Sequence, residues 1–482
     1  MDPRHSDLPA GPGPAPCVVE AAIGRFHELL GNDNAAQVTQ HRLLKHQRDA
    51  RMAPDGRPLT HMLRPRFMSE AEHDQGCADG ALLARAIHRL AAYALRPGEA
   101  GDLVRRQLAL SDEERALVAM APPAGDCGSH SRLDGFRAAG RTLFVEYNAH
   151  SPGGVISQDL LADAFLDTPV MEAFTREYTA RPVPGLPRMA DTLVGAWAAG
   201  GSPGGAPHAA IVDWESKLPW EFGALQARLR RRGVPTVVCT PDDLHYDTGR
   251  GLFTRDADGR PRPVTVVHRR AVLADLLSRY GPAFAEHPMT RAWASGACVM
   301  VNPYTSNLAN KKSALALLTD PSTRCLLPAP EAAAAGALVP WTRLVRPGAT
   351  ACPDGRTVDL LDFARSRRER LVLKPNDDYG GNGVVCGWRT TDADWRTALG
   401  RALATPHVVQ ERVPVPVVPY PVLEGDRLRV ERSGESTDPF LFGADAPGCV
   451  SRVSTGSLIN VSTGGCPVPV FRVAPRRREA AA

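Results

Sequence analysis

The stretch LVLKPNDDYGGNGVVCGW, residues 371–388, predicts two short strands joined by a glycine-rich loop. The first strand ends at Lys374, and the loop carries Gly380, Gly381 and Gly383. Glycine lacks a Cβ, so the backbone N–H groups of such a loop can approach a phosphate chain closely. The lysine before the loop can then neutralise the phosphate charge. An ordinary glycine-containing hairpin is the alternative interpretation, and the pattern is not a Walker loop, which needs Gly-Lys-Ser/Thr at the start of a helix.

Lysine is scarce in this chain, and one of the few lysines precedes the glycine loop. Of 57 lysine and arginine residues, five are lysine, at positions 45, 217, 311, 312 and 374. The abundance of Ala, Arg, Gly and Pro indicates a coding bias that replaces lysine with arginine wherever either will serve. A compact ammonium and a planar guanidinium fit differently against phosphate, so the remaining lysines are candidate functional residues. Chance survival of one or two lysines is the alternative.

The composition predicts a soluble protein of two or three domains. The chain has 482 residues, of which 43% are hydrophobic and 23% charged, the usual proportions of a globular protein. A net charge of +4 does not indicate a nucleic-acid or membrane-surface partner. No apolar run reaches the length of about 18 residues that spans a bilayer, and the proline-rich start is not a signal peptide. Ten scattered cysteines without a Cys-x-x-Cys pair indicate reduced thiols, so we expect a cytoplasmic protein.

Helical periodicity dominates the first quarter of the chain. Apolar residues at helical spacing predict helices over 18–31 and 80–96. A serine followed by acidic residues predicts a third helix over 111–120. The stretch 59–69 has no regular pattern, and a glycine-rich stretch at 195–209 is a candidate domain boundary.

Alternating strands and helices follow that boundary. A strand–helix–strand pattern spans 209–240, and Asp-Gly between two extended runs predicts a hairpin over 251–270. A helix is predicted over 310–320. Short strands at 371–375, 383–388 and 407–413 complete a second α/β region. The last of these ends in Gln410-Glu411, a polar edge that can contact an adenine and its ribose, although a solvated strand end is the alternative.

A second polar stretch, FVEYNAHSPGG at 144–154, ends a pair of strands predicted at 132–136 and 142–148. Glu146 and Asn148 are two residues apart on one strand, so their side chains point to the same face. A carboxylate and an amide oxygen that project together suggest a hard cation. A lone Glu-x-Asn is structural in most proteins, which is the alternative.

Lys374 with its glycine loop, followed by the Gln-Glu strand edge, resembles the nucleotide half of an ATP-grasp enzyme. The resemblance implies a fold that holds ATP between two α+β subdomains, with a second lysine upstream of the glycine loop. Lys312 matches that lysine, and Lys311 is its uncertain neighbour. The implied nucleotide contacts are Lys312, Lys374, Gly380, Gly381, Gly383, Gln410 and Glu411.

The metal ligands of that family are an Asp and, about a dozen residues later, Glu-x-Asn before a Ser/Pro/Gly turn. Asp134, Glu146 and Asn148 match these ligands in identity, order and spacing. The resemblance therefore implies that the three residues hold Mg²⁺. Two carboxylates and an amide oxygen leave coordination positions for phosphate oxygens and water.

The order of the segments departs from the ordinary family, in which the Asp and Glu-x-Asn follow the glycine loop. Here they lie far upstream of it, while SRVSTGSLINVSTGG at 451–465 resembles the arginine-bearing stretch that ordinarily comes just before the Asp. The layout is similar to that of circularly permuted ATP-grasp proteins, the group that includes relatives of glutathionylspermidine synthase. The resemblance implies that Arg452 contacts the transferring phosphate and that Asn460 helps to order the site. A surface arginine and a turn-forming asparagine are the alternatives.

The resemblance implies a fold class of α+β / α/β, a circularly permuted ATP-grasp with a helical N-terminal region and a small pre-ATP-grasp α/β domain. The expected division is a disordered tail at 1–19, a helical region at 20–130, a permuted ATP-grasp segment with the metal ligands at 131–206, a pre-ATP-grasp-like α/β domain at 207–300, the nucleotide-binding core at 301–472 and a second disordered tail at 473–482.

The function that the resemblance implies is an ATP- and Mg²⁺-dependent ligase, with Arg452 and Lys374 as catalytic residues. It would join a small-molecule or peptide carboxylate to an amine or thiol through an acyl phosphate. The alternatives are a phosphotransferase that uses the same site, and a nucleotide-binding pseudoenzyme that acts as a scaffold. Relatives often carry a lysine within the glycine loop where this chain has Asn382, which favours the scaffold.

Some charged residues carry weaker hypotheses. Arg269 and Arg270 end a predicted strand and are candidates to hold a substrate carboxylate. Lys217 lies where a strand gives way to a helix, a common ligand position in open α/β sheets. Strand-end charges usually do no more than solvate a turn. The sequence specifies neither the acid and amine substrates nor the oligomeric state.

Overall fold

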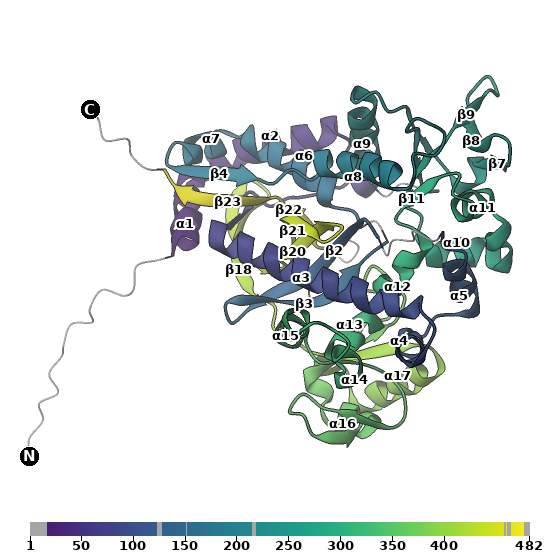
Figure 1. Ribbon diagram of the computed structural model, residues 1–482. Helices are drawn as coiled ribbons and strands as arrows, with labels where there is room; N and C mark the ends of the chain where they lie inside the picture. Colours follow the sequence, from purple (N-terminus) through teal and green to yellow (C-terminus); the bar gives the residue numbers. More distant parts are fainter. Residues whose placement is uncertain are drawn as a thin grey trace, which may run out of the picture.

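The computed structural model describes residues 17–122, 128–150, 152–214, 218–456, 459 and 464–476. Over these residues the protein is a mixed α/β molecule whose helices pack on several separate sheets (Figure 1). Of the helices in the described part of the chain, none has both the length and the apolar character that a membrane crossing requires.

The central sheet joins segments from the first third and the last seventh of the chain. Its strand order is β18-β19-β21-β20-β2-β3, with β22 paired to β21. β2 pairs antiparallel with β3 on one side and with β20 on the other, where Arg132 lies opposite Phe440. The two strands predicted at 132–136 and 142–148 are therefore confirmed as β2 and β3. The strands are β2 (His130–Ala138), β3 (Arg141–Asn148), β18 (Val417–Glu424), β19 (Arg427–Glu435), β20 (Asp438–Phe442), β21 (Asp445–Ser454) and β22 (Cys466–Val468).

A four-stranded sheet carries the segment around Lys374, in the order β12-β17-β15-β16. All of its pairs are antiparallel, and Lys374 lies opposite Val408. Two helices cover this sheet and share an apolar core with it, to which Trp341, Leu373 and Trp395 contribute. The elements of this lobe are β12 (Thr342–Leu344), β13 (Ala349–Ala351), β14 (Thr357–Asp359), α16 (Leu360–Ser366), β15 (Leu371–Pro375), β16 (Val385–Cys386), α17 (Asp392–Ala404) and β17 (His407–Glu411).

A parallel sheet has the order β11-β10-β5-β6. β5, α9 and β6 form the strand–helix–strand unit predicted over 209–240. The hairpin predicted over 251–270 is formed by β8 and β9 and ends at Pro263, because Val266–Arg269 instead joins the parallel sheet as β10. The elements are α8 (Leu186–Ala199), β5 (Ala209–Val212), α9 (Pro219–Arg231), β6 (Thr236–Cys239), β7 (His245–Asp247), β8 (Gly251–Arg255), β9 (Pro261–Pro263), β10 (Val266–Arg269), α10 (Leu273–Tyr280), α11 (Pro288–Ala294) and β11 (Val299–Val301).

A small sheet of order β1-β23-β4 ties the two ends of the described chain together. Phe26, Phe67 and Phe174 pack beneath it, with the rings of Phe67 and Phe174 stacked 4.8 Å apart. The elements here are α1 (Val18–Leu30), α2 (Asp33–Asp49), β1 (Arg66–Met68), α6 (Val155–Leu166), α7 (Pro169–Thr175), β4 (Tyr178–Pro182) and β23 (Val470–Pro475).

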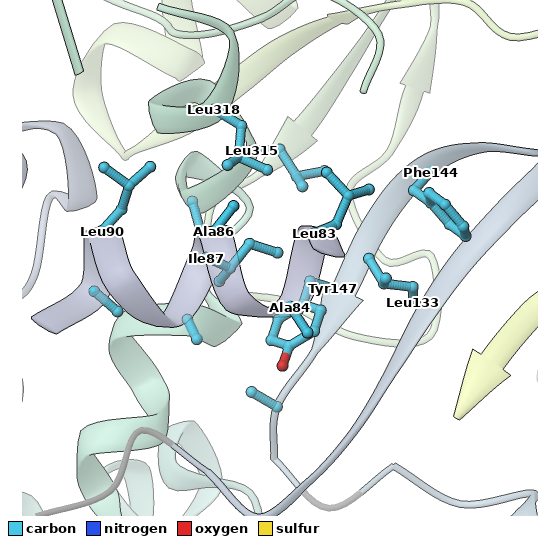
Figure 2. Close-up of a cluster of buried hydrophobic side chains, with 14 of the residues drawn as sticks. Leu83, Ala84, Ala86, Ile87, Leu90, Leu133, Phe144, Tyr147, Leu315 and Leu318 are labelled. Atoms are coloured by element: carbon cyan, nitrogen blue, oxygen red, sulfur yellow. The ribbon is translucent and has the colours of Figure 1, made fainter. Parts of the chain in front are cut away.

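Helix α3 lies between the central sheet and the helices that lead to the lysine-bearing lobe. Its Leu83 lies beside Leu315 of α13, and Ile87 belongs to the same buried cluster, to which Leu133 and Phe144 contribute from β2 and β3 (Figure 2). The remaining helices are α3 (Glu70–Ala94), α4 (Glu99–Leu108), α5 (Asp112–Ala119), α12 (Asn307–Asn310), α13 (Ser313–Thr319), α14 (Pro321–Arg324) and α15 (Ala329–Leu338).

The structure differs from the sequence expectations at several boundaries. The helix predicted from 80 begins at Glu70, because the side chain of Ser69 accepts from the Glu72 N–H at 3.1 Å. The first third of the candidate boundary at 195–209 belongs to α8, which ends at Ala199. The pattern at 310–320 is interrupted, with α12 ending before α13 begins at Ser313.

Two further differences arise from pairing between distant segments. β1 lies in the stretch without a regular pattern, 59–69, and the tail expected from 473 includes the last residues of β23. These two strands pair with each other in parallel. Neither strand has a local signal that would reveal a partner so far away in the chain.

Replacing Phe144 with alanine should destabilise the fold strongly. The side chain is fully buried in the cluster that joins β3 to α3, and a large cavity there costs about 3–5 kcal/mol. Urea unfolding followed by circular dichroism would measure the loss. Leu403→Ala, at a position that is 47% exposed, is the control and should change stability by less than ~0.5 kcal/mol. A cost below about 1 kcal/mol for Phe144→Ala would contradict the packing.

Candidate active site

The β2–β3 hairpin presents four polar side chains on one face. Asp134 lies opposite Glu146, and Arg132 lies opposite Asn148. Directly opposed residues of an antiparallel pair share a face, as do residues two apart on one strand. Tyr147 points to the other face, into the core, where its hydroxyl lies 2.8 Å from Nε2 of His88. Because Tyr147 lies between Glu146 and Asn148 on the strand and points into the core, Glu146 and Asn148 point away from it.

Asp134 is held by two arginines. Its Oδ1 accepts from Nε of Arg132 at 2.6 Å, and its Oδ2 lies 2.9 Å from Nη2 of Arg452. Burial acts to raise the pKa of the Asp134 carboxyl, but the two guanidinium charges hold that pKa below its usual value. The arginine implied from the far end of the chain thus contacts the first of the three implied metal ligands.

Asp438 is a site residue that sequence reasoning missed. It is fully buried at the start of β20, and its Oδ2 accepts from Nε of Arg452 at 3.0 Å and from Oγ of Ser436 at 2.6 Å. Burial raises the pKa of Asp438 in spite of the arginine charges. A single acid at a strand start has no motif, so only the pairing of β20 with β2 and β21 reveals its place. Asp438 and Asp134 together balance Arg132 and Arg452.

The two implied phosphate-binding lysines reach the same hairpin. Nζ of Lys312 lies 3.1 Å from Oε1 of Glu146 and donates to the backbone carbonyl of Asp378 at 2.5 Å. Nζ of Lys374 donates to the carbonyl of Val145 at 3.0 Å and to Oε1 of Gln410 at 2.8 Å. The segment 134–148 and the segment around Lys374 therefore meet in space.

The glycine loop begins directly after β15 and stays close to Lys312. Gly380, Gly381 and Gly383 have φ values of 72°, 79° and 65°, a left-handed region that favours glycine. A Cβ on Gly383 would also come within 2.6 Å of the Pro375 ring. Asp378, at the base of the loop beside Lys312, is a second residue that the sequence analysis did not select.

The polar edge of β17 has a different geometry from the one expected. Gln410 is buried, and its Nε2 donates to Oγ1 of Thr342 at 3.0 Å while its Oε1 accepts from Lys374. Gln410 therefore holds the lysine in place. Glu411 is half-buried, and its backbone N–H donates to the carbonyl of Trp341 at 2.8 Å.

The residues on the hairpin differ in how well they fit a magnesium ion. Nδ2 of Asn148 is buried and has no hydrogen-bond partner within the described residues, and rotating the amide would place its oxygen there instead. Glu146 is 27% exposed on its side chain and has Lys312 beside one oxygen. Both oxygens of Asp134 already accept from arginines. Glu146 and Asn148 fit a cation, and Asp134 fits the role of holding the arginines.

Other implied residues lie outside this arrangement. Asn460 and Lys217 lie outside the described residues. In the portion of the chain described, no group of three or more His, Cys, Asp and Glu side chains is arranged to hold a metal. A cation on the hairpin would therefore need ligands from elsewhere, such as an amide, a phosphate or water.

The comparisons with known proteins support the fold. No protein-family model matches the chain, and no curated protein matches its sequence. Among solved structures, it is similar to a glutathione synthetase-like effector from Globodera pallida in its apo form. The two are 14% identical, the similarity covers 91% of this chain and 97% of the effector, and the TM-score is 0.54. The likeness supports a mixed α/β fold similar to that of the effector and, at this identity, nothing further.

Lys374 makes the stability of the protein depend on pH. Burial lowers the pKa of Lys374 to about 8 from an ordinary value of 10.5, with Glu146 acting to raise it and Lys312 to lower it. Between these values the unfolded chain keeps the proton that the folded protein has released, so rising pH favours the folded state. Lys374→Met removes this contribution. The free energy of unfolding of the wild type should rise relative to that of Lys374→Met from pH 8 to 10.5, as measured by urea unfolding. If the difference in free energy of unfolding between the two proteins stayed constant over this pH range, the lowered pKa of Lys374 would be contradicted.

Proposed function

We propose that the protein is an ATP- and Mg²⁺-dependent ligase that joins a carboxylate to an amine or a thiol. The observation that carries this proposal is the meeting of Lys312 and Lys374 with the β2–β3 hairpin, at 3.1 Å from Glu146 and 3.0 Å from the Val145 carbonyl. Two ammonium groups face an oxygen-rich strand there. The two ammonium groups could bind a triphosphate, and the oxygen atoms of the strand could bind a cation.

The side chains divide the work of such a reaction. Bound Mg²⁺ would supply a positive charge that bridges phosphate oxygens. Glu146 and Asn148 would hold the ion, and Lys312 and Lys374 would bind and orient the phosphates together with the loop at 380–383. Arg452, fixed by Asp134 and Asp438, would stabilise the charge that spreads over the transferring group. Catalysis of this kind depends on positioning and charge, and no covalent protein intermediate is needed.

A buried, uncompensated cation favours an acidic substrate. Arg269 is fully buried, donates to the carbonyls of Asn302 at 3.0 Å and Ala271 at 2.7 Å, and has no partner for Nη2 among the described residues. His150, two residues beyond Asn148, likewise has no partner there for either ring nitrogen. Burial and, to a smaller extent, the charge of Arg269 lower the pKa of His150 to about 3. Buried charge without a partner is costly, and a substrate carboxylate would remove that cost.

Two alternatives use the same site. A phosphotransferase would pass the phosphoryl group to a hydroxyl or a carboxylate and stop there. A nucleotide-binding scaffold is favoured by Asn382, where relatives often carry lysine, and by the description of the structural neighbour as an effector. Incubation with ATP, Mg²⁺ and pooled amino acids separates the three. ADP with a new amide identifies the ligase, ADP with a phosphorylated product identifies the phosphotransferase, and nucleotide binding without turnover favours the scaffold.

Glu146→Gln should reduce ADP formation by about 100-fold or more, because an amide binds Mg²⁺ far less well than a carboxylate does. The fold should persist, since the side chain keeps its size and is partly exposed. Glu424→Gln is the matched control, with a side chain that is 80% exposed on β18, and should turn over normally. Release of ADP would be followed by a coupled assay. Near-normal turnover in Glu146→Gln would refute the metal assignment.

Arg269→Met should raise the KM for the acid substrate about tenfold or more while the affinity for nucleotide stays unchanged. The reason is the loss of a charged hydrogen-bond donor from the acid side of the site only. Steady-state kinetics with each substrate varied in turn would measure the two effects. Equal losses toward acid and nucleotide would indicate general damage and would reject the assignment.

A further inference from the structure

Lys311 is next to Lys312 in the sequence, but its side chain contacts different residues. Its side chain is 4% exposed, and its Nζ lies 2.7 Å from Oδ2 of Asp377. The same Nζ donates to Oε1 of Glu114. Lys311 is therefore enclosed between two carboxylates, whereas Lys312 points to Glu146 on the hairpin. The two consecutive lysines therefore have different partners: Lys311 pairs with two acids, one of them at the base of the glycine loop, and Lys312 pairs with the hairpin.

Glu114 belongs to the N-terminal helices, far from the nucleotide lobe in sequence. It is the third residue of α5 and completes a capping box, in which Oε2 accepts from the Ser111 N–H at 2.8 Å. Its Oε1 accepts from Nδ2 of Asn307 at 2.9 Å as well as from Lys311. One buried carboxylate therefore caps α5 and holds the ammonium that reaches the glycine loop.

Three successive residues at the base of the glycine loop, 376–378, are each held by hydrogen bonds or an ion pair. Asn376 accepts from the Ser313 N–H at 2.9 Å and donates to the carbonyl of Leu108 at 2.9 Å. Asp377 is held by Lys311, and the carbonyl of Asp378 is held by Lys312. The glycines at 380–383 follow directly. The loop is thus anchored where it leaves β15, while its glycine tip has the backbone freedom to close on a ligand.

We infer that Glu114 is a positioning residue for nucleotide binding, acting through Lys311 and Asp377 on the base of the glycine loop. The inference rests on the proposed function and gives the N-terminal helical region a part in it. Removing one member of a buried ionic group leaves the others uncompensated. Without Glu114, the ammonium of Lys311 is paired on one side only, and Asp377 loses the fixed position that sets where the loop begins.

Calorimetric titration of the full chain with Mg²⁺ and a non-hydrolysable ATP analogue tests the inference. Glu114→Gln keeps the size of the side chain and removes its charge, and Lys311→Met removes the link itself. Each should weaken binding of the analogue about tenfold, the scale found when partners of binding groups are removed. Ser111→Ala is the control, because it breaks the cap of the same helix without touching Lys311, and its affinity should equal that of the wild type.

A second measurement needs no nucleotide. Hydrogen exchange of the backbone at 376–384 should be faster in Glu114→Gln and Lys311→Met than in the wild type and Ser111→Ala. Unchanged affinity and exchange in the first two variants would overturn the inference and leave the ligase proposal intact. Equal weakening in all three variants would also overturn it, since loss of the helix cap would then suffice. A wild type that binds no nucleotide would overturn both.

Discussion

The antiparallel pairing of β2 with β20 is the constraint on which the candidate site depends. It places Arg132 opposite Phe440 and brings Asp438 to the backbone of Gly135, whose N–H donates to Oδ1 of Asp438 at 3.2 Å. β21 follows β20 in the same sheet and carries Arg452 to Asp134. If that pairing were lost, the hairpin would keep Glu146 and Asn148 on one face but would lose the arginine and the acid that balances it.

Most of the charged side chains of the site are paired with an opposite charge. Asp134 and Asp438 compensate Arg132 and Arg452, while Glu146 lies beside Lys312. Buried ions are costly unless they are paired, which explains why the polar face of the hairpin is stable beside an apolar core. Lys374 donates to neutral oxygens, while Arg269 and His150 each have a buried nitrogen without a partner in the described structure. The missing partners at Arg269 and His150 distinguish the part of the site proposed to bind the acid substrate from the part proposed to bind phosphate.

Sequence patterns predicted those parts of the structure whose signals are local. Strand alternation placed Glu146 and Asn148 on one face, and the rarity of lysine drew attention to Lys312 and Lys374, both of which contact the hairpin or its neighbours. Residues whose role depends on distant pairing had no such signal. Asp438 becomes part of the site through β20 and β21, and Glu114 is one of the acidic residues that predict only the start of a helix. The circular permutation remains a prediction.

The lysine-bearing lobe from β12 to β17 has its own apolar core, separate from the one around α3. The chain enters this lobe at Trp341 and leaves it after Glu411, and the N–H of Glu411 donates to the carbonyl of Trp341 at 2.8 Å. The two points at which the chain enters and leaves the lobe therefore lie side by side. A lobe with its own core whose first and last strands are adjacent can rotate as a unit about a hinge at those strands. Rotation about that hinge would have to break the hydrogen bonds of Asn376 with Ser313 and Leu108 as well as the one between Lys374 and Val145, so the anchored base of the glycine loop holds the two cores in one orientation.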